Sequence, residues 1–211
     1  MKKRCKKAAR EQQPYNLLAY TLGDENFVDP FDPAGRFADT PKAWSRFRAY
    51  LQEIYKDIRS LNAQWESSFE DWDSIRFENE GEMIKNMENP SAWTDYRMWI
   101  AREFIAVNRR FRDVIKKEHP QAVVGFDGCE QFSSYDGYDW WELVKGMDLI
   151  QTYHTYIVPG VHSNKIFNGE ALKSFRPKAK LSGGWMNSAD FRYGGQYVPW
   201  YLCLNGWNGV W

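Results

Sequence analysis

The N-terminal part of the chain shows a basic helical pattern followed by an apolar run of strand length. Residues 1–12 are rich in Lys and Arg and are typical of the end of a helix, which Pro14 stops. Residues 15–22 are mostly apolar and predict a strand. Asp24 and Glu25 follow almost directly, so the pattern places two carboxylates at the C-terminal tip of that strand.

Two amphipathic helices are predicted further along the chain. Thr40 followed by Pro41 indicates a helix start, and the apolar residues after it keep the spacing of one helix face as far as about Asn62. Residues 91–118 predict a second, longer helix with its Arg and Lys side chains outward. Its inward positions are predicted to be Trp93, Ile100, Phe104, Val107, Phe111 and Val114. Between the two helices, residues 65–89 are acidic, aromatic and irregular, which is too long for a plain connector.

Short strand and helix patterns alternate over the rest of the chain. Strands are predicted over residues 122–126, 148–153, 179–181 and 207–211. Helices are predicted over residues 138–145, 168–175 and 198–204. Alternation without hairpin signals predicts parallel βαβ units. Five such strands fit a doubly wound sheet as well as a barrel. The glycine-rich phosphate fingerprints of nucleotide folds are absent, however, and polar and aromatic residues collect at the strand ends, where (β/α)8 barrels build their active sites.

Composition excludes several classes of partner. The 211 residues are 43% hydrophobic and 27% charged, which is ordinary for one packed domain over residues 1–211. The 28 basic and 28 acidic residues cancel, so nothing favours a nucleic-acid partner, and no apolar run approaches a membrane span. Cys5, Cys129 and Cys203 are scattered without CxxC spacing, which argues against a disulfide framework or a zinc site. Neither a metal nor a cofactor is predicted.

Aromatic residues are unusually frequent, with 11 Trp, 12 Tyr and 13 Phe making 17% of the chain. Many of these rings lie at helical core spacing, so we interpret most of the aromatic residues as core residues. The rings beside loops have a second interpretation, because the C–H faces of pyranose sugars stack on indole and phenol rings.

Three stretches resemble glycoside hydrolase family 42. Residues 18–25 resemble the end of the fourth barrel strand, where the family carries its acid/base Glu, although the family usually has Asn where this chain has Asp24. Residues 51–73 resemble the segment that follows that strand, with its Tyr, Leu-Asn, Trp, Phe and Trp-Asp pattern. Residues 199–201 together with residues 206–211 resemble the approach to the eighth strand.

The resemblance implies a partial (β/α)8 barrel comprising strands four to eight, in which parallel strands alternate with helices. A barrel needs all eight strands to remove its edges, so we expect the chain to be truncated at both ends. Residues 1–10 lack the apolar region of a secretory signal. Because the true N-terminus is expected to lie further upstream, a cytoplasmic and a secreted location both stay open.

The resemblance gives Glu25 the general acid/base role in glycoside hydrolysis. Asp24 then stands where a relative's Asn hydrogen-bonds the sugar 2-OH; Asp accepts such a bond but cannot donate one while ionised. A second negative charge beside Glu25 would raise the pKa of Glu25, which suits an acid.

The second carboxylate is harder to identify. The family places its nucleophile at the tip of the seventh strand, and residues 181–186 contain no carboxylate. Asp190, in the loop beyond, and Asp127, at the tip of the fifth strand, are the candidates. Retaining carboxyl pairs lie roughly 5–5.5 Å apart and inverting pairs roughly 6.5–9.5 Å apart. Asp190 on a loop suits the inverting distance better.

The leading hypothesis is hydrolysis of a β-linked, galactoside-like sugar. The candidate contacts to a carbohydrate substrate are Asp24, Asp127, Tyr153, His154, Trp185 and Trp207. For the aromatic residues and His154, ordinary packing is the competing interpretation. A non-catalytic carbohydrate-binding barrel is the main alternative, and an inverting hydrolase using Asp127 or Asp190 is another. Family members often form homo-oligomers, and residues 65–99 could build such a contact or equally a lid.

Overall fold

A computed structural model of the chain describes residues 2–24, 40–85, 88–127, 138–153, 170–171, 173–175, 181–185 and 198–210. The chain divides into two compact units. The first, here called the sheet unit, comprises Met1–Asn26, Ile105–Ser133 and Tyr138–Trp211. The second, the helical unit, comprises Phe27–Phe104 and Ser134–Gly137. The prediction of one domain over the whole chain stays a prediction.

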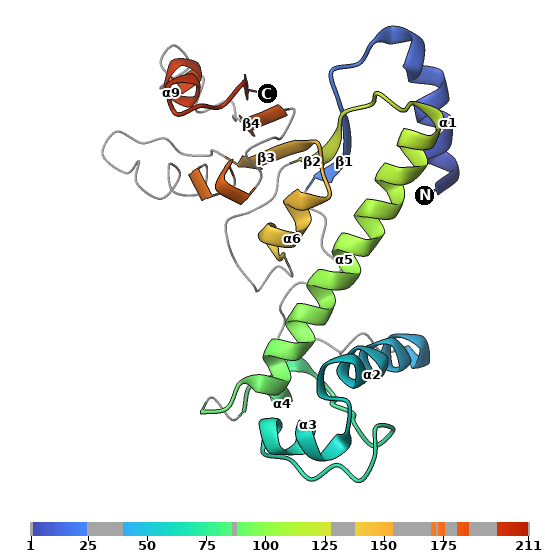
Figure 1. Cartoon of the computed structure of the whole chain (residues 1–211), viewed down its shortest axis with the longest axis vertical. Helices are drawn as coiled ribbons and strands as arrows, with labels where there is room; N and C mark the ends of the chain where they lie inside the picture. Colours follow the sequence, from blue (N-terminus) through green and yellow to red (C-terminus); the bar gives the residue numbers. More distant parts are fainter. Residues whose placement is uncertain are drawn as a thin grey trace. The chain divides into compact units, whose positions relative to one another are not determined.

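The sheet unit is built on parallel strands that pair in the order of the chain (Figure 1). They are β1 (Tyr20–Asp24), β2 (Val124–Asp127), β3 (Leu149–Tyr153), β4 (Leu181–Trp185) and β5 (Gly209–Val210). A doubly wound sheet reverses its strand order at a switch point, whereas a barrel adds each new strand beside the last. The order β1-β2-β3-β4-β5 therefore favours the barrel and confirms the predicted parallel arrangement.

The first strand begins later than its apolar pattern predicts. Helix α1 (Lys2–Gln12) is followed by a 3-10 turn, η1 (Gln13–Tyr15), and by Asn16 in a left-handed conformation at φ 49°. These turns occupy the first two positions of the predicted strand, and β1 begins only at Tyr20. Tyr15 and Leu18 are 72% and 62% exposed, so the start of the apolar run is surface rather than strand.

The predicted helices of the sheet unit are present where the structure describes them. They are α6 (Trp140–Lys145) and α9 (Val198–Leu204), and residues 170–171 and 173–175 are also helical. Asp139 caps α6 by accepting a hydrogen bond from the Glu142 backbone N–H at 3.1 Å. The strand predicted over residues 179–181 instead runs over Leu181–Trp185, so Gly183 and Gly184 belong to β4.

Helix α5 (Ser91–Glu118) holds the sheet unit together through its basic side chains. Arg109 Nη2 donates to the Glu142 carbonyl oxygen at 3.0 Å, and Arg112 donates to the Gly146 carbonyl oxygen. A Cβ on Gly146 would lie 2.7 Å from Arg109 Nε, so a larger residue there would displace the Arg109 side chain. These bonds attach α5 to α6 and to the turn that follows it.

Asp148 connects α5 to the beginning of two strands. Its carboxylate lies 2.5 Å from Lys116 Nζ of α5 and accepts a weaker bond from the Val124 backbone N–H at 3.4 Å. Asp148 directly precedes β3, and Val124 begins β2. One buried carboxylate therefore fixes the N-terminal ends of neighbouring strands against the helix.

The helical unit begins as the sequence predicts and then departs from it. Thr40 caps α2 (Pro41–Tyr55), its hydroxyl accepting from the Ala43 N–H at 3.1 Å. The prediction of one helix to about residue 62 is wrong, because the helix breaks at Lys56, which has φ 65°. Asp57 then caps a separate helix, α3 (Ile58–Trp65), by accepting from the Ser60 N–H at 2.7 Å.

Aromatic rings dominate the core of the helical unit. Phe47 is fully buried and packs edge-on against Tyr96, with 5.6 Å between ring centroids. It packs against the tilted ring of Trp99 at 5.2 Å. The buried residues of this core are Trp44, Phe47, Leu51, Leu61, Trp65, Ile75, Met83, Tyr96, Trp99 and Ile100. This confirms that many of the abundant aromatic residues build the core.

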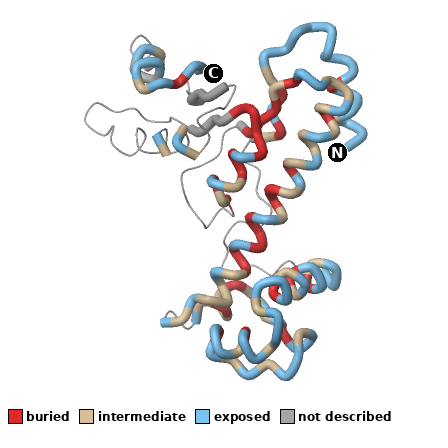
Figure 2. Tube along the Cα trace, viewed as in Figure 1, coloured by how far each residue is buried: buried red, intermediate tan, exposed pale blue. Residues whose placement is uncertain are grey.

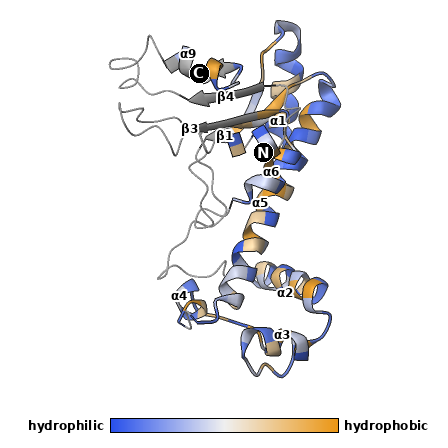
Figure 3. Cartoon of the chain, turned by 60° about the vertical axis from the view of Figure 1, so that its left-hand side comes forward, coloured by the Kyte–Doolittle hydropathy of each residue, from blue (hydrophilic) through white to orange (hydrophobic). Residues whose placement is uncertain are grey.

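The buried face of α5 differs from the predicted one in part (Figure 2). Ile100 and Phe104 are buried as predicted, but Val107 is 37% exposed and Trp93 is only half-buried. Figure 3 shows hydrophobic and hydrophilic positions interspersed along the helix. Residues of α5 up to Phe104 belong to the helical unit, and the rest belong to the sheet unit. One apolar stripe along the whole helix therefore does not describe its buried positions.

A buried ion pair lies in the helical unit, where the sequence predicted outward Arg side chains on α5. Glu80 belongs to α4 (Glu80–Met83) and Arg97 to α5, and each residue is only 3% exposed. Arg97 Nη1 lies 3.1 Å from Glu80 Oε1. Trp93 Nε1 donates to the other Glu80 oxygen at 2.9 Å. Buried charges persist when they are paired and hydrogen-bonded, and both conditions hold here.

Asp95 joins α2, α3 and α5. One of its carboxylate oxygens accepts from the Tyr55 hydroxyl at 2.5 Å and from Trp65 Nε1 at 2.8 Å. Burial raises the pKa of the Tyr55 phenol, and the hydrogen bond to Asp95 raises it further. The protonated phenol is therefore part of the folded structure.

Replacing Arg97 by Met should lower the free energy of unfolding by about 3–5 kcal/mol, because Glu80 would keep a buried charge without its cation. Urea denaturation measures the loss. Arg102→Met is the matched control, since the Arg102–Glu53 pair has side chains that are 54% and 59% exposed. The control should cost less than about 1 kcal/mol. Equal losses in both variants would contradict the account of the buried pair.

The raised pKa of Tyr55 makes stability depend on alkaline pH. The unfolded phenol loses its proton near pH ~10, whereas the folded one keeps it, so stability should fall as pH rises above about 10. Tyr55→Phe should flatten this slope in unfolding measured between roughly pH 10 and 11.5. Tyr15→Phe, at a residue 72% exposed, should leave the slope unchanged. A Tyr55→Phe slope identical to that of the original protein would refute the prediction.

Candidate active site

The C-terminal ends of the parallel strands meet at one edge of the sheet. Asp24 at the end of β1 pairs in register with Asp127 at the end of β2. Tyr153 at the end of β3 pairs with Trp185 at the end of β4. The structure therefore brings the backbones of these four predicted site residues to one edge, which we call the carboxyl edge.

An irregularity in β1 lies directly before the carboxyl edge. Thr21 pairs with Gly125, and the next recorded pair is Asp24 with Asp127. Two residues of β1 therefore stand between these pairs where β2 has one, which is the arrangement of a β-bulge. Gly23, inside the bulge, has φ 155°. Bulges recur at barrel rims beside active sites, where they redirect the residues that follow.

Three predicted site residues, Glu25, His154 and Asp190, lie outside the described residues. Glu25 directly follows Asp24, and His154 directly follows Tyr153, so each continues the chain from the carboxyl edge. Their proposed roles stay predictions. Gly23 was not singled out from the sequence, although a glycine immediately before an Asp-Glu pair at a strand end was the signal for it.

Trp207 is the one predicted sugar contact whose side chain the structure describes. The ring is 4% exposed, so it presents little of its face to a ligand. Its backbone precedes β5, in which Gly209 pairs with Gly183 of β4. Because Trp185 ends β4 two residues after Gly183, Trp207 lies toward the opposite end of the strands. This geometry favours core packing, and sugar contact by Trp207 stays a prediction.

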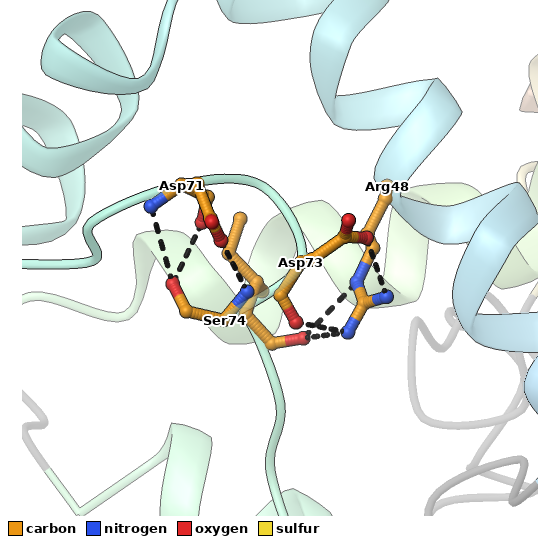
Figure 4. Close-up of polar contacts among 5 residues, drawn as sticks. Arg48, Asp71, Asp73 and Ser74 are labelled. Carbon is orange, nitrogen blue, oxygen red and sulfur yellow. Dashed lines mark hydrogen bonds and ion pairs between the residues drawn. The ribbon is translucent and has the colours of Figure 1, made fainter.

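Two aspartates of the segment after β1, Asp71 and Asp73, hold a turn (Figure 4). Arg48 of α2 donates from Nη1 to Asp73 Oδ1 at 3.1 Å and from Nη2 to the Asp73 carbonyl oxygen at 2.6 Å. It also reaches the Ile75 carbonyl oxygen at 3.0 Å. Asp71 accepts from the Ser74 N–H at 2.8 Å. Within this stretch, which resembles family 42, both carboxylates therefore have structural partners.

No group of three or more His, Cys, Asp and Glu side chains in the described part of the chain is arranged to hold a metal ion. No described helix is both long and apolar enough to cross a bilayer.

Solved structures with a similar fold include several glycosidases. An exo-carrageenase from Bacteroides ovatus matches 99% of this chain and 33% of its own, with a TM-score of 0.70 and 15% identity. A β-galactosidase from Bacillus circulans sp. alkalophilus matches 83% of this chain and 26% of its own, with a TM-score of 0.61 and 17% identity. The catalytic domain of a β-amylase from Paenibacillus polymyxa matches 99% of this chain and 60% of its own, with a TM-score of 0.63 and 16% identity.

These likenesses show a shared fold, that of barrel glycosidases, and confirm the predicted fold class. The chain spans about a quarter to a third of the length of the β-galactosidase and the exo-carrageenase. Comparison with curated proteins finds no match. A sequence profile of glycoside hydrolase family 42, described as β-galactosidase, matches residues 33–195. Since that match covers well over half of the residues, the chain belongs to glycoside hydrolase family 42.

Proposed function

We propose that the protein containing this chain hydrolyses the glycosidic bond of a β-linked, galactoside-like sugar, with Glu25 as its general acid/base. The observation that carries the proposal is the carboxyl edge, where Asp24 pairs with Asp127 and Glu25 follows directly. Family membership supports the reaction class, since glycosidases of most families use two carboxyl groups.

Glu25 would protonate the oxygen of the leaving group and afterwards accept a proton from the attacking water. Asp24, directly before it, would accept a hydrogen bond from a sugar hydroxyl, because an ionised carboxylate has no proton to donate. Its negative charge would raise the pKa of Glu25 and keep the acid protonated closer to neutral pH.

Asp127 and Asp190 are the candidates for the second carboxylate. Adjacent strands lie about 4.8 Å apart, so Asp127 on the strand beside β1 is close to the backbone from which Glu25 extends. That proximity suits the separation of a retaining pair, roughly 5–5.5 Å. Asp190 would instead suit an inverting pair. The register of β1 with β2 favours Asp127.

The galactoside part of the proposal rests on the family description and on one structural relative with that activity in its name. The exo-carrageenase and the β-amylase share the fold, so the fold alone does not select the sugar. A second candidate function is carbohydrate binding without turnover. It is favoured by the sequence Leu-Ser-Gly-Gly-Trp of β4, which carries no carboxylate where the family has its nucleophile.

Glu25→Gln should reduce kcat on a phenyl β-galactoside by roughly 10²–10⁴-fold, because a poor leaving group needs protonation. Substrate binding should persist in calorimetry. The control is Glu142→Gln on α6, a surface carboxylate paired with Lys145, and it should leave kcat unchanged. If the unaltered protein binds sugar without turning it over, the binding function replaces the catalytic one. Turnover unaffected by Glu25→Gln would remove Glu25 from the mechanism.

Removing the second carboxylate should be rescued by a small anion. We expect Asp127→Ala to lose at least about 10²-fold in kcat, and added azide to restore turnover with formation of a glycosyl azide. Asp190→Ala, measured in parallel, should retain more activity than Asp127→Ala. The opposite ranking, with an inverted anomeric product by NMR, would assign the role to Asp190.

A further inference from the structure

The bulge in β1 decides which residue of that strand stands beside Asp127. From the pair Thr21–Gly125, a regular strand would place Gly23 opposite Asp127. The register instead places Asp24 there. The extra residue of β1 therefore lies immediately before Asp24, which is the last residue of the strand.

The bulge also decides the face of the sheet on which Asp24 lies. Successive residues of a strand lie on opposite faces, so a shift of one residue exchanges the faces. Tyr20 and Leu22 are each only 9% exposed, and Thr21 between them is exposed. Without the bulge, Asp24 would fall on the buried face of Tyr20 and Leu22. With it, Asp24 takes the face of Thr21.

Two physical costs make this arrangement specific. A carboxylate placed on a buried face without a partner loses its hydration, which disfavours that placement. A backbone φ of 155°, as Gly23 has, is one that residues with side chains rarely adopt. Glycine at position 23 adopts this φ without steric conflict. The bulge that it permits keeps Asp24 off the buried face.

We propose that Gly23 is a positioning residue for the active site: its bulge sets Asp24 in register with Asp127, on the face shared with Thr21. The inference rests on the proposed function for its catalytic consequence, although the register itself can be tested without any activity. Gly23 touches no substrate in this account and acts through the placement of Asp24 and of the residue that follows it.

The first test measures kinetics of the protein expressed from the complete reading frame that contains this chain. Gly23→Ala should lower kcat by at least about tenfold while KM changes less than about threefold, since misplacement of catalytic groups acts on the chemical step. Gly206→Ala is the matched control. Gly206 also has a positive φ, 79°, but it precedes β5 on the side away from the carboxyl edge. The control should destabilise the fold comparably and leave kcat within about twofold of the original.

Deleting Gly23 separates register from strain. The deletion removes the extra residue and the unusual φ together, and a regular strand would then still place Asp24 opposite Asp127. We expect this variant to have at least about tenfold more kcat than Gly23→Ala. If the deletion and Gly23→Ala are equally impaired although both are folded, the register does not matter and the proposal is overturned.

The second test is structural and stays informative if Gly23→Ala folds poorly or the protein lacks turnover. In a background with Cys5, Cys129 and Cys203 replaced by Ser, the pair Asp24→Cys with Asp127→Cys should form a disulfide on oxidation. Register partners on neighbouring strands fall within the Cα separation of about 4.4–6.8 Å that a disulfide requires. The pair Gly23→Cys with Asp127→Cys should cross-link at least about tenfold more slowly.

The outcomes distinguish a failure of the proposed function from a failure of the proposed positioning role of Gly23. Fast cross-linking at position 24 with no turnover in the original protein would overturn the proposed function and leave the register intact. Turnover abolished by Glu25→Gln but unaffected by Gly23→Ala would overturn the positioning role alone. Faster cross-linking at position 23 than at position 24 would overturn the register and the inference with it.

Discussion

Parallel pairing in chain order is the constraint on which the candidate site depends. Each strand hydrogen-bonds to the one before it, so every strand must end at the same edge, and residues scattered over the sequence are collected there. Helix α5 supports this arrangement from the other end of the strands, where Lys116 reaches Asp148 and Arg112 reaches the turn after α6. The candidate site is thus a consequence of strand order.

Much of the fold follows from local pattern, because the 2-residue and 3.6-residue periods are strong where an element has one buried face. The cap at Thr40, the length of α5 and the alternation of strands and helices were all predictable from local sequence pattern. The pattern fails where one residue overrides it. Lys56 in a left-handed conformation divides a periodic helix, and the turn at Asn16 leaves an apolar run exposed. The burial of Arg97 depends on Glu80, a partner from an irregular segment that periodicity cannot pair.

Sequence pattern likewise predicts some features of the candidate site and misses others. Sequence pattern was sufficient to place Asp24, Asp127, Tyr153 and Trp185 at strand ends, and their pairing at one edge needed only the assumption of parallel strands. It could not show the bulge, because an extra residue in one strand is visible only against its partner. It could not separate a packed Trp207 from a sugar platform either, since both interpretations need an aromatic residue near a strand. Proximity across strands is a tertiary property.

The proposed reaction rests on two observations: the family 42 match over residues 33–195, and the strand register that pairs Asp24 with Asp127 at the carboxyl edge. The most direct measurement is a crystal structure of the Glu25→Gln variant with an intact β-galactoside bound. The account predicts the glycosidic oxygen within hydrogen-bonding distance of residue 25 and the sugar ring over the ends of β1 and β2. A sugar bound away from the carboxyl edge, with residue 25 making no contact to it, would contradict the account.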